Sequence, residues 1–145
     1  MARSLTLRLL VVWLGATHAP MAAADQVPLK QARINFLYAE KALEDGRLER
    51  FRELAALVED YALHPYLRYA YLRRTLERAA PEAVGEFLET YADTPLASRL
   101  RRAWLHHLGR HGRWEDYLAF YRPQDDAALR CWHARTLLET GHPER

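Results

Sequence analysis

Apolar residues recur at helical spacing along most of the chain. Ala32, Phe36, Ala39 and Leu43 follow one another in steps of four, three and four residues, which places their side chains on one face of an α-helix. No stretch combines strict apolar–polar alternation with many β-branched residues, as a half-buried strand would. The pattern therefore predicts an all-α chain.

Six further apolar stripes follow the first, and each predicts another amphipathic helix. In chain order they are Leu48, Phe51, Leu54, Ala55 and Val58; Tyr66, Tyr69, Leu72 and Leu76; Val84, Phe87, Leu88 and Tyr91; Leu96, Leu100, Ala103, Trp104 and Leu108; Trp114, Tyr117, Leu118 and Tyr121; and Ala127, Cys131, Ala134 and Leu138. Because only short turns separate these stripes, consecutive helices are expected to lie antiparallel as neighbours.

Helix start signals stand between the stripes. Pro65 and Pro81 occur where a new helix would begin, and proline is tolerated in the first turn because that turn needs no N–H donor. Thr94 precedes another proline and can cap the free N–H groups of the fifth helix, and Gly109 and Gly112 are expected to end that helix. Asp125 or Asp126 can cap the seventh.

The turn residues are also roughly periodic. Gly46, Pro81, Gly112 and Gly141 are separated by 35, 31 and 29 residues, and the sequence at 46–51 resembles that at 112–117. A helix pair repeated at this interval predicts a right-handed α-superhelix, or solenoid, of about seven short antiparallel helices. Residues 141–145 resemble the start of another helix, so we expect residues 31–145 to be a superhelical domain truncated at its C-terminal end.

The N-terminal residues predict a signal peptide. Residues 1–8 carry two arginines and no acid, residues 9–16 are apolar, and Ala22 and Ala24 offer a cleavage site before a short lead at 25–30. The apolar run is too short to cross a bilayer, about 30 Å thick in its core. We therefore expect export with cleavage near Ala24, and no stable membrane anchor afterwards.

Charge and cysteine content exclude several functions. The chain has 145 residues with a formal charge of +2, and its first 24 residues supply both surplus charges. Since the remainder is neutral, the composition does not favour nucleic-acid binding. A single cysteine, Cys131, excludes an internal disulfide and a multi-cysteine zinc site. On its apolar stripe, Cys131 is expected to be a small core residue rather than a nucleophile paired with His133.

The search for chemistry gives no catalytic, metal or cofactor site. His107 and His111 share a helix face with zinc-ligand spacing and have His106 beside them, but the surrounding arginines favour a solvated polar face. Five arginines lie between residues 95 and 114: Arg99, Arg101, Arg102, Arg110 and Arg113. They could face an anionic partner, but the favoured explanation is a helix face exposed to solvent, as most charge runs are.

Aromatic and acidic residues are equally open to a structural explanation. Four tyrosines between residues 61 and 71 could stack on sugars, yet aromatic residues at helical spacing more often belong to the core. Carboxylate pairs such as Glu82 with Glu86, and Glu115 with Asp116, stand in no recognisable catalytic context. Trp104, Trp114 and Tyr121 are expected to be the largest anchors between helices.

Several short motifs occur in a fixed order, at residues 42–46, 64–69, 87–91, 91–105, 112–114, 120–121, 129–131 and 137–141. Together they resemble the N-terminal superhelical domain of soluble lytic murein transglycosylases. The positions that match as structural anchors are Tyr66, Tyr69, Asp93, Thr94, Pro95, Trp104, Trp114, Tyr121, Cys131 and Gly141.

The resemblance implies both a fold and a cellular context. In that family a ring-like α-superhelix precedes a lysozyme-like catalytic domain in the periplasm. The enzyme cleaves the β-1,4 bond between N-acetylmuramic acid and N-acetylglucosamine in peptidoglycan and forms 1,6-anhydro products. The family's catalytic glutamate stands in a Glu-Ser motif that this sequence lacks. The resemblance therefore implies a scaffold that is inactive alone, without a cofactor, and that reaches peptidoglycan through the catalytic domain it contacts in the full-length protein.

A second hypothesis remains open at this point. A stand-alone periplasmic adaptor with helical repeats, similar to tetratricopeptide proteins, could bind a protein partner in a concave groove. The repeat interval permits this, but no repeat carries the whole tetratricopeptide pattern of Trp, Leu-Gly, Tyr and closing Pro.

Overall fold

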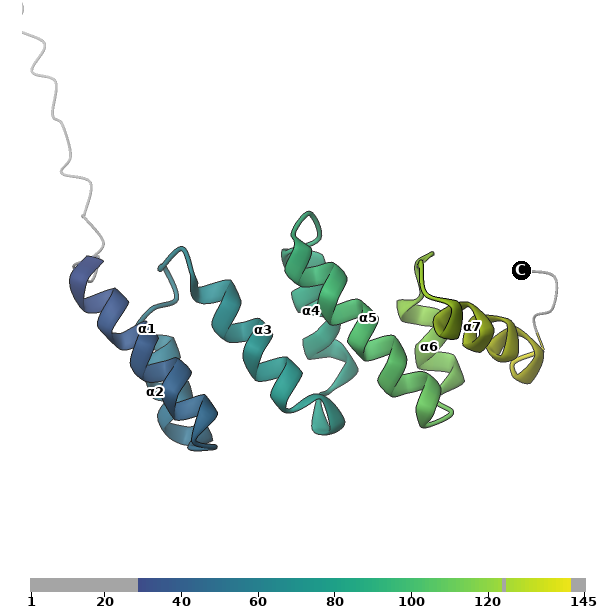
Figure 1. The fold of residues 1–145 in the computed structure, drawn as a ribbon, viewed down its shortest axis with the longest axis horizontal. Coiled ribbons are helices and arrows are strands. Elements are labelled where there is room, and N and C mark those ends of the chain that lie inside the picture. Colours follow the sequence, from purple (N-terminus) through teal and green to yellow (C-terminus); the bar gives the residue numbers. More distant parts are fainter. Residues whose placement is uncertain (1–28, 124, 142–145) are drawn as a thin grey trace, which may run out of the picture.

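The computed structural model describes residues 29–123 and 125–141, and within them it contains helices joined by turns and no strand (Figure 1). The elements are α1 (Leu29–Glu44), α2 (Leu48–Ala56), α3 (His64–Arg74), the short 3₁₀ turn η1 (Leu76–Arg78), α4 (Pro81–Thr90), α5 (Pro95–Arg110), α6 (Trp114–Phe120) and α7 (Ala127–Glu139). The all-α prediction and its seven helices are confirmed. The predicted signal peptide, 1–24, lies outside the described residues, and α1 already begins inside the predicted lead.

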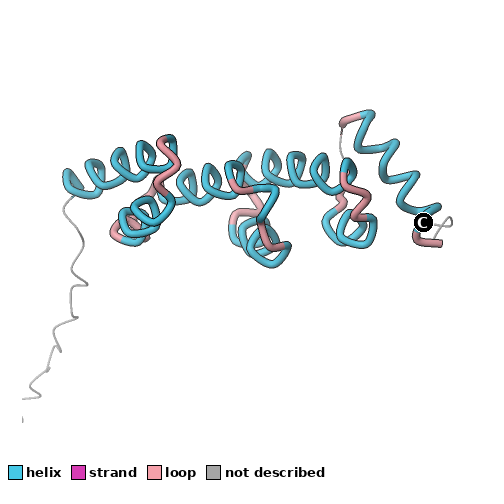
Figure 2. The backbone as a smooth tube through the Cα atoms, turned by 90° about the horizontal axis from the view of Figure 1, so that it is seen from below, coloured by secondary structure: helices cyan, strands magenta, loops and turns pink. Residues whose placement is uncertain are grey.

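The helices form two layers in a row. Helices α1, α3, α5 and α7 contact one another in sequence, while α2, α4 and α6 pack beneath them against their chain neighbours. Figure 2 shows the layers edge-on, with the longer helices across the top and the shorter ones below. Each helix thus buries its apolar face mainly against elements close to it in the chain.

The two segments that resemble each other in sequence form the same turn. Gly46 and Gly112 have φ of +74° and +64°, a left-handed conformation that favours glycine. The next residue donates its N–H to a carbonyl five positions back in both turns, Arg47 to Ala42 at 2.8 Å and Arg113 to Leu108 at 3.0 Å. The internal repeat is therefore present in the backbone as well as in the sequence.

Side-chain caps form at two of the predicted positions. Thr94 Oγ1 accepts the N–H of Ala97 at 3.3 Å at the start of α5. Asp126 accepts the N–H of Leu129 at 3.2 Å at the start of α7, which decides between the two aspartates. These bonds satisfy N–H groups that the first helical turn cannot pair internally.

Two hydrophobic clusters fill the space between the layers. The first joins α1, α2 and the start of α3 around Phe36, Phe51 and Leu67, and the second continues from Leu72 to Leu129 around α5. Since α3 contributes one buried leucine to each cluster, it links the two halves of the row.

The stripe predicted for α7 is wrong. Ala127, Cys131, Ala134 and Leu138 are all exposed, and Leu138 reaches 73% exposure. The helix instead buries Leu129 and Thr136 and half-buries Trp132. Apolar residues occur on several sides of α7, so spacing alone could not select the face that meets α5 and α6.

Two other details differ from the predictions. Tyr66 was assigned to the inward face of α3, but it is 53% exposed and Leu67 is buried in its place. Gly109 was assigned to the end of the fifth helix, yet α5 continues to Arg110 and Gly109 is buried within it. Trp132 of α7 packs against this glycine, which explains its position.

Among the described helices, none has both the length and the apolar character that crossing a bilayer requires.

Candidate functional site

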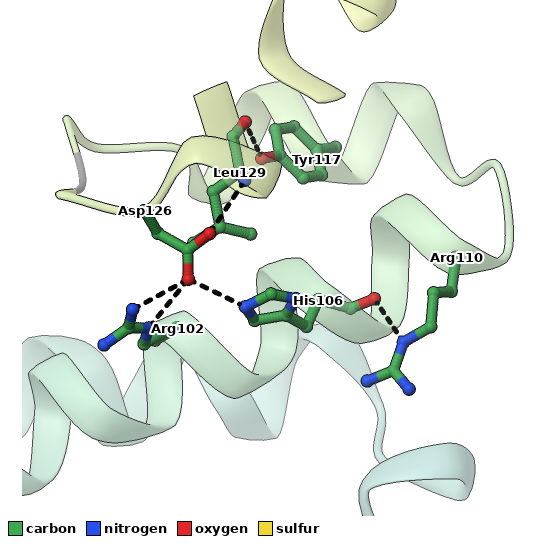
Figure 3. Close-up of polar contacts among 6 residues, drawn as sticks. All are labelled: Arg102, His106, Arg110, Tyr117, Asp126 and Leu129. Carbon is green, nitrogen blue, oxygen red and sulfur yellow. Dashed lines mark hydrogen bonds and ion pairs between the residues drawn. The ribbon is translucent and has the colours of Figure 1, made fainter. Parts of the chain in front are cut away.

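A group of polar contacts joins α5 to the start of α7 (Figure 3). Arg102 donates to Asp126 Oδ2 from Nε at 3.0 Å and from Nη2 at 2.8 Å. His106, one turn further along α5, places Nε2 3.1 Å from the same oxygen, while Oδ1 accepts the Leu129 N–H. We call Arg102, His106 and Asp126 the Asp126 clasp.

The clasp is suited to holding two helices together rather than to proton transfer. The pKa of Asp126 lies well below its usual value of 3.8. The Arg102 guanidinium lowers it most, and the Leu129 N–H and His106 lower it further. A carboxylate that stays ionised in this way cannot serve as a general acid near neutral pH. Its side chain is only 13% exposed, and both its oxygens are already engaged.

The clasp predicts a loss of stability in acid. Because the folded-state pKa of Asp126 is lowered, its contribution is present above the ordinary pKa of 3.8 and disappears as the pH falls through the folded-state value. The wild-type chain is expected to be more stable than Asp126→Asn at pH 7, and this difference should shrink below pH 3.8. Urea unfolding of both proteins across this range measures it, and a difference independent of pH would contradict the assignment.

A second polar contact fastens α6 to α7. The buried Tyr117 donates its hydroxyl to the Leu129 carbonyl at 2.7 Å (Figure 3). Burial is the main cause that raises the pKa of Tyr117, and the neighbouring Tyr121 and Asp126 raise it further. Tyr121 in turn stacks on His133 of α7, with ring centroids 3.8 Å apart. The start of α7 is therefore held by both α5 and α6.

Replacing Tyr117 with phenylalanine is expected to lower the free energy of unfolding by about 1 kcal/mol. The ring would still fill its buried site, so the change isolates the hydroxyl and its bond to the Leu129 carbonyl. The contribution of Tyr117 should also decline above its ordinary pKa of 10.0, because the unfolded chain then loses the phenolic proton more readily. Tyr38→Phe, at an exposed position on α1, is the control, and equal losses would contradict the prediction.

The three histidines of α5 have separate surroundings. His106 joins the clasp, while His107 is 8% exposed and stacks on Trp104 at 5.2 Å between ring centroids. The predicted solvated face therefore holds for His111, which is exposed, and is wrong for His107. Burial lowers the pKa of His107, and His111 and Arg113 lower it further. In the described part of the chain, no group of three His, Cys, Asp or Glu residues is placed to hold a metal ion.

The five arginines of this segment do not form one exposed face. Arg102 belongs to the clasp, and Arg113 donates to Asp116 at 2.8 Å while lying 5.5 Å from the Trp104 ring centre. Arg101 is half-buried, and burial together with Arg122 lowers its pKa. Of these five, Arg99 and Arg110 are exposed and have no carboxylate partner among the described residues.

Three of the four clustered tyrosines pack in the core, as expected. Tyr71 stacks on Phe51 at 5.3 Å, Tyr61 meets Phe36 edge-on at 5.7 Å, and Tyr69 packs against Phe87 at 6.4 Å. All three rings are thus partly buried against the two hydrophobic clusters, which favours the structural explanation over sugar stacking.

The remaining anchor positions lie at turns or helix ends. Asp93 is exposed in the turn before α5, and Thr94 caps that helix ahead of Pro95. Trp114 is half-buried at the start of α6, with Arg135 5.2 Å from its ring centre. Gly141 has φ of +71° after α7. The structure thus spreads these residues along the row and does not gather them into one site.

Two of the four carboxylates noted in the sequence, Glu86 and Asp116, are engaged with arginines. Glu86 accepts from Arg68 at 3.0 Å, and Asp116 accepts from Arg113. Neither lies beside a second carboxylate with the shielded surroundings that acid–base cleavage of a glycosidic bond requires. The sequence offers Asp126 as one of two candidate caps but does not indicate its pairing with Arg102 and His106, for which the only signal is their spacing of four residues on α5.

No family model and no solved structure matches the chain. Among curated proteins it is similar to the soluble lytic murein transglycosylase of Salmonella typhimurium, with 26% identity over 104 residues. The match covers 72% of this chain and 16% of that enzyme, so the chain spans about a sixth of its relative's length.

Proposed function

We propose that the chain is a scaffold segment of a lytic transglycosylase, corresponding to part of the superhelical domain that precedes the catalytic domain in this family. The similarity over 104 residues to a soluble lytic murein transglycosylase carries the proposal. In the full-length protein, the activity would be cleavage of the bond between N-acetylmuramic acid and N-acetylglucosamine with formation of 1,6-anhydro products.

The arrangement of the helices supports a superhelical scaffold. Consecutive hairpins pack in a row, and the turn after α1 recurs after α5 with the same backbone hydrogen bonds. A row of this kind can be extended at its ends, because each hairpin depends chiefly on its neighbours. The handedness of the coil, the signal peptide at 1–24 and a periplasmic location belong to the same proposal.

The chemistry is assigned to the rest of the enzyme. Three of the carboxylates considered above, Glu86, Asp116 and Asp126, are paired with arginine. The segment would position the catalytic domain on peptidoglycan and would hold no catalytic residue itself.

Digestion of purified murein sacculi tests the proposal. The complete gene product, as the cell makes it, is expected to release 1,6-anhydro muropeptides, whereas the 145-residue chain alone should release none. Product from the chain alone would overturn the scaffold assignment. Absence of product from the complete, folded gene product would overturn the link to lytic transglycosylases and favour an adaptor with helical repeats.

A further inference from the structure

Two depressions lie side by side where α1, α3 and α5 end. These helix ends lie along the lower edge of the ribbon in Figure 1. Each has a volume of about 240 Å³, and both are lined by Arg74 and Glu77. The first also contains Leu48 and Arg78, and the second His107, Arg110 and His111 beside Arg73 and Leu76. We call this surface the basic groove.

The groove has an excess of unpaired positive charge. Its walls hold four arginines and one glutamate. Elsewhere the exposed arginines commonly pair with a nearby carboxylate, as Arg50 does with Glu53 at 2.8 Å. The guanidinium groups of Arg73 and Arg78, by contrast, make no ion pair or hydrogen bond within the described residues.

The carbonyl groups at the helix C-termini engage only some of the arginine N–H donors in the groove. Arginine in a last turn is favoured by the partial negative charge of the helix C-terminus, and Arg74 uses this by donating to the Glu44 carbonyl at 3.2 Å. Arg110 likewise donates Nε to the His106 carbonyl at 3.1 Å (Figure 3). Each guanidinium has five N–H donors, so most donors in the groove remain open to a ligand.

We propose that the basic groove docks an extended peptide that carries carboxylates on both sides of an amine. Arginine binds carboxylates through paired, charge-assisted hydrogen bonds, which suits the two outer walls. Glu77 stands in the wall common to both depressions and would accept the amine. A continuous polyanion is disfavoured, because it would place negative charge against Glu77. The inference does not depend on the proposed function.

A titration with the capped peptide Glu-Gly-Lys-Gly-Glu tests the groove. Its dissociation constant is measured by NMR on the full chain at low ionic strength, where such contacts are least screened. The variant Arg73→Gln/Arg78→Gln is expected to bind about tenfold more weakly. The matched control is Arg33→Gln/Arg99→Gln, which removes two exposed, equally unpaired charges far from the groove and should leave the affinity unchanged within about twofold.

Two further ligands separate the peptide from other anions. On the wild-type chain, Glu-Gly-Gly-Gly-Glu should bind more weakly than the lysine peptide, whereas on Glu77→Gln the two peptides should bind equally. Polyphosphate should also bind the wild-type chain more weakly than the lysine peptide does. No binding of the peptide, or equal weakening in both arginine variants, would overturn the proposal. Tighter binding of polyphosphate would overturn the assignment to a peptide. None of these outcomes bears on murein cleavage by the complete gene product.

Discussion

Replacing Trp104 with alanine is expected to lower the free energy of unfolding by about 3–5 kcal/mol. Trp104 is fully buried in the second hydrophobic cluster. His107 stacks on its ring, Phe120 meets it edge-on at 6.0 Å, and the Arg113 guanidinium lies 5.5 Å from its ring centre. Alanine would leave a cavity where α5 and α6 meet. The free energy of unfolding of a domain is commonly about 5–15 kcal/mol. The variant should therefore be close to losing, or should lose, its cooperative unfolding transition.

Two companion variants separate volume from polarity. The indole Nε1 of Trp104 has no hydrogen-bond partner within the described residues, and a buried unpaired donor costs about 1–3 kcal/mol. Trp104→Phe removes that donor together with part of the ring, so its loss should be well below that of Trp104→Ala. Trp114→Ala, at a half-buried position, should also lose less. Urea unfolding followed by circular dichroism measures all three, and an unchanged midpoint for Trp104→Ala would contradict the assignment.

The elements that could be predicted from sequence are those fixed by neighbouring residues. The left-handed glycines at 46, 112 and 141 and the Thr94 cap each act within a few residues of their own position, so local signals place them. The repeat of the turn at Gly46 and Gly112 is visible for the same reason. Packing along the row is also local, which makes the division into hairpins readable from the stripes.

The elements that could not be predicted depend on contacts between distant residues. Asp126 meets Arg102 and His106 across 24 and 20 residues, and its role as a cap gave no hint of these partners. The inward face of α7 is decided by Trp132 fitting over Gly109 and by Tyr117 bonding to Leu129. His107 was assigned to solvent because its neighbours in the chain are charged, whereas the Trp104 ring covers it in the fold.

Replacing Gly109 with alanine is expected to destabilise the chain by about 2 kcal/mol, although alanine is the better helix former. An added Cβ would lie 2.5 Å from the Cδ2 and Cε3 atoms of Trp132, closer than carbon atoms can approach. The Trp132 ring is bulky and rests edge-on against His106 at 5.3 Å, so it must move with α7 rather than turn aside. That movement would strain the Asp126 clasp as well.

Gly85→Ala is the matched control, because it places the same methyl group in the interior of another helix. The added Cβ at position 85 would lie 3.7 Å from the Phe120 ring, an ordinary contact, so only the gain in helix propensity remains. Gly85→Ala should therefore stabilise the chain by up to about 1 kcal/mol, opposite in sign to Gly109→Ala. Urea unfolding gives both values, and amide hydrogen exchange in α7 should accelerate only in Gly109→Ala. If both variants were stabilised alike, Trp132 would not rest on Gly109, and the contact between α5 and α7 would have to be assigned to the clasp alone.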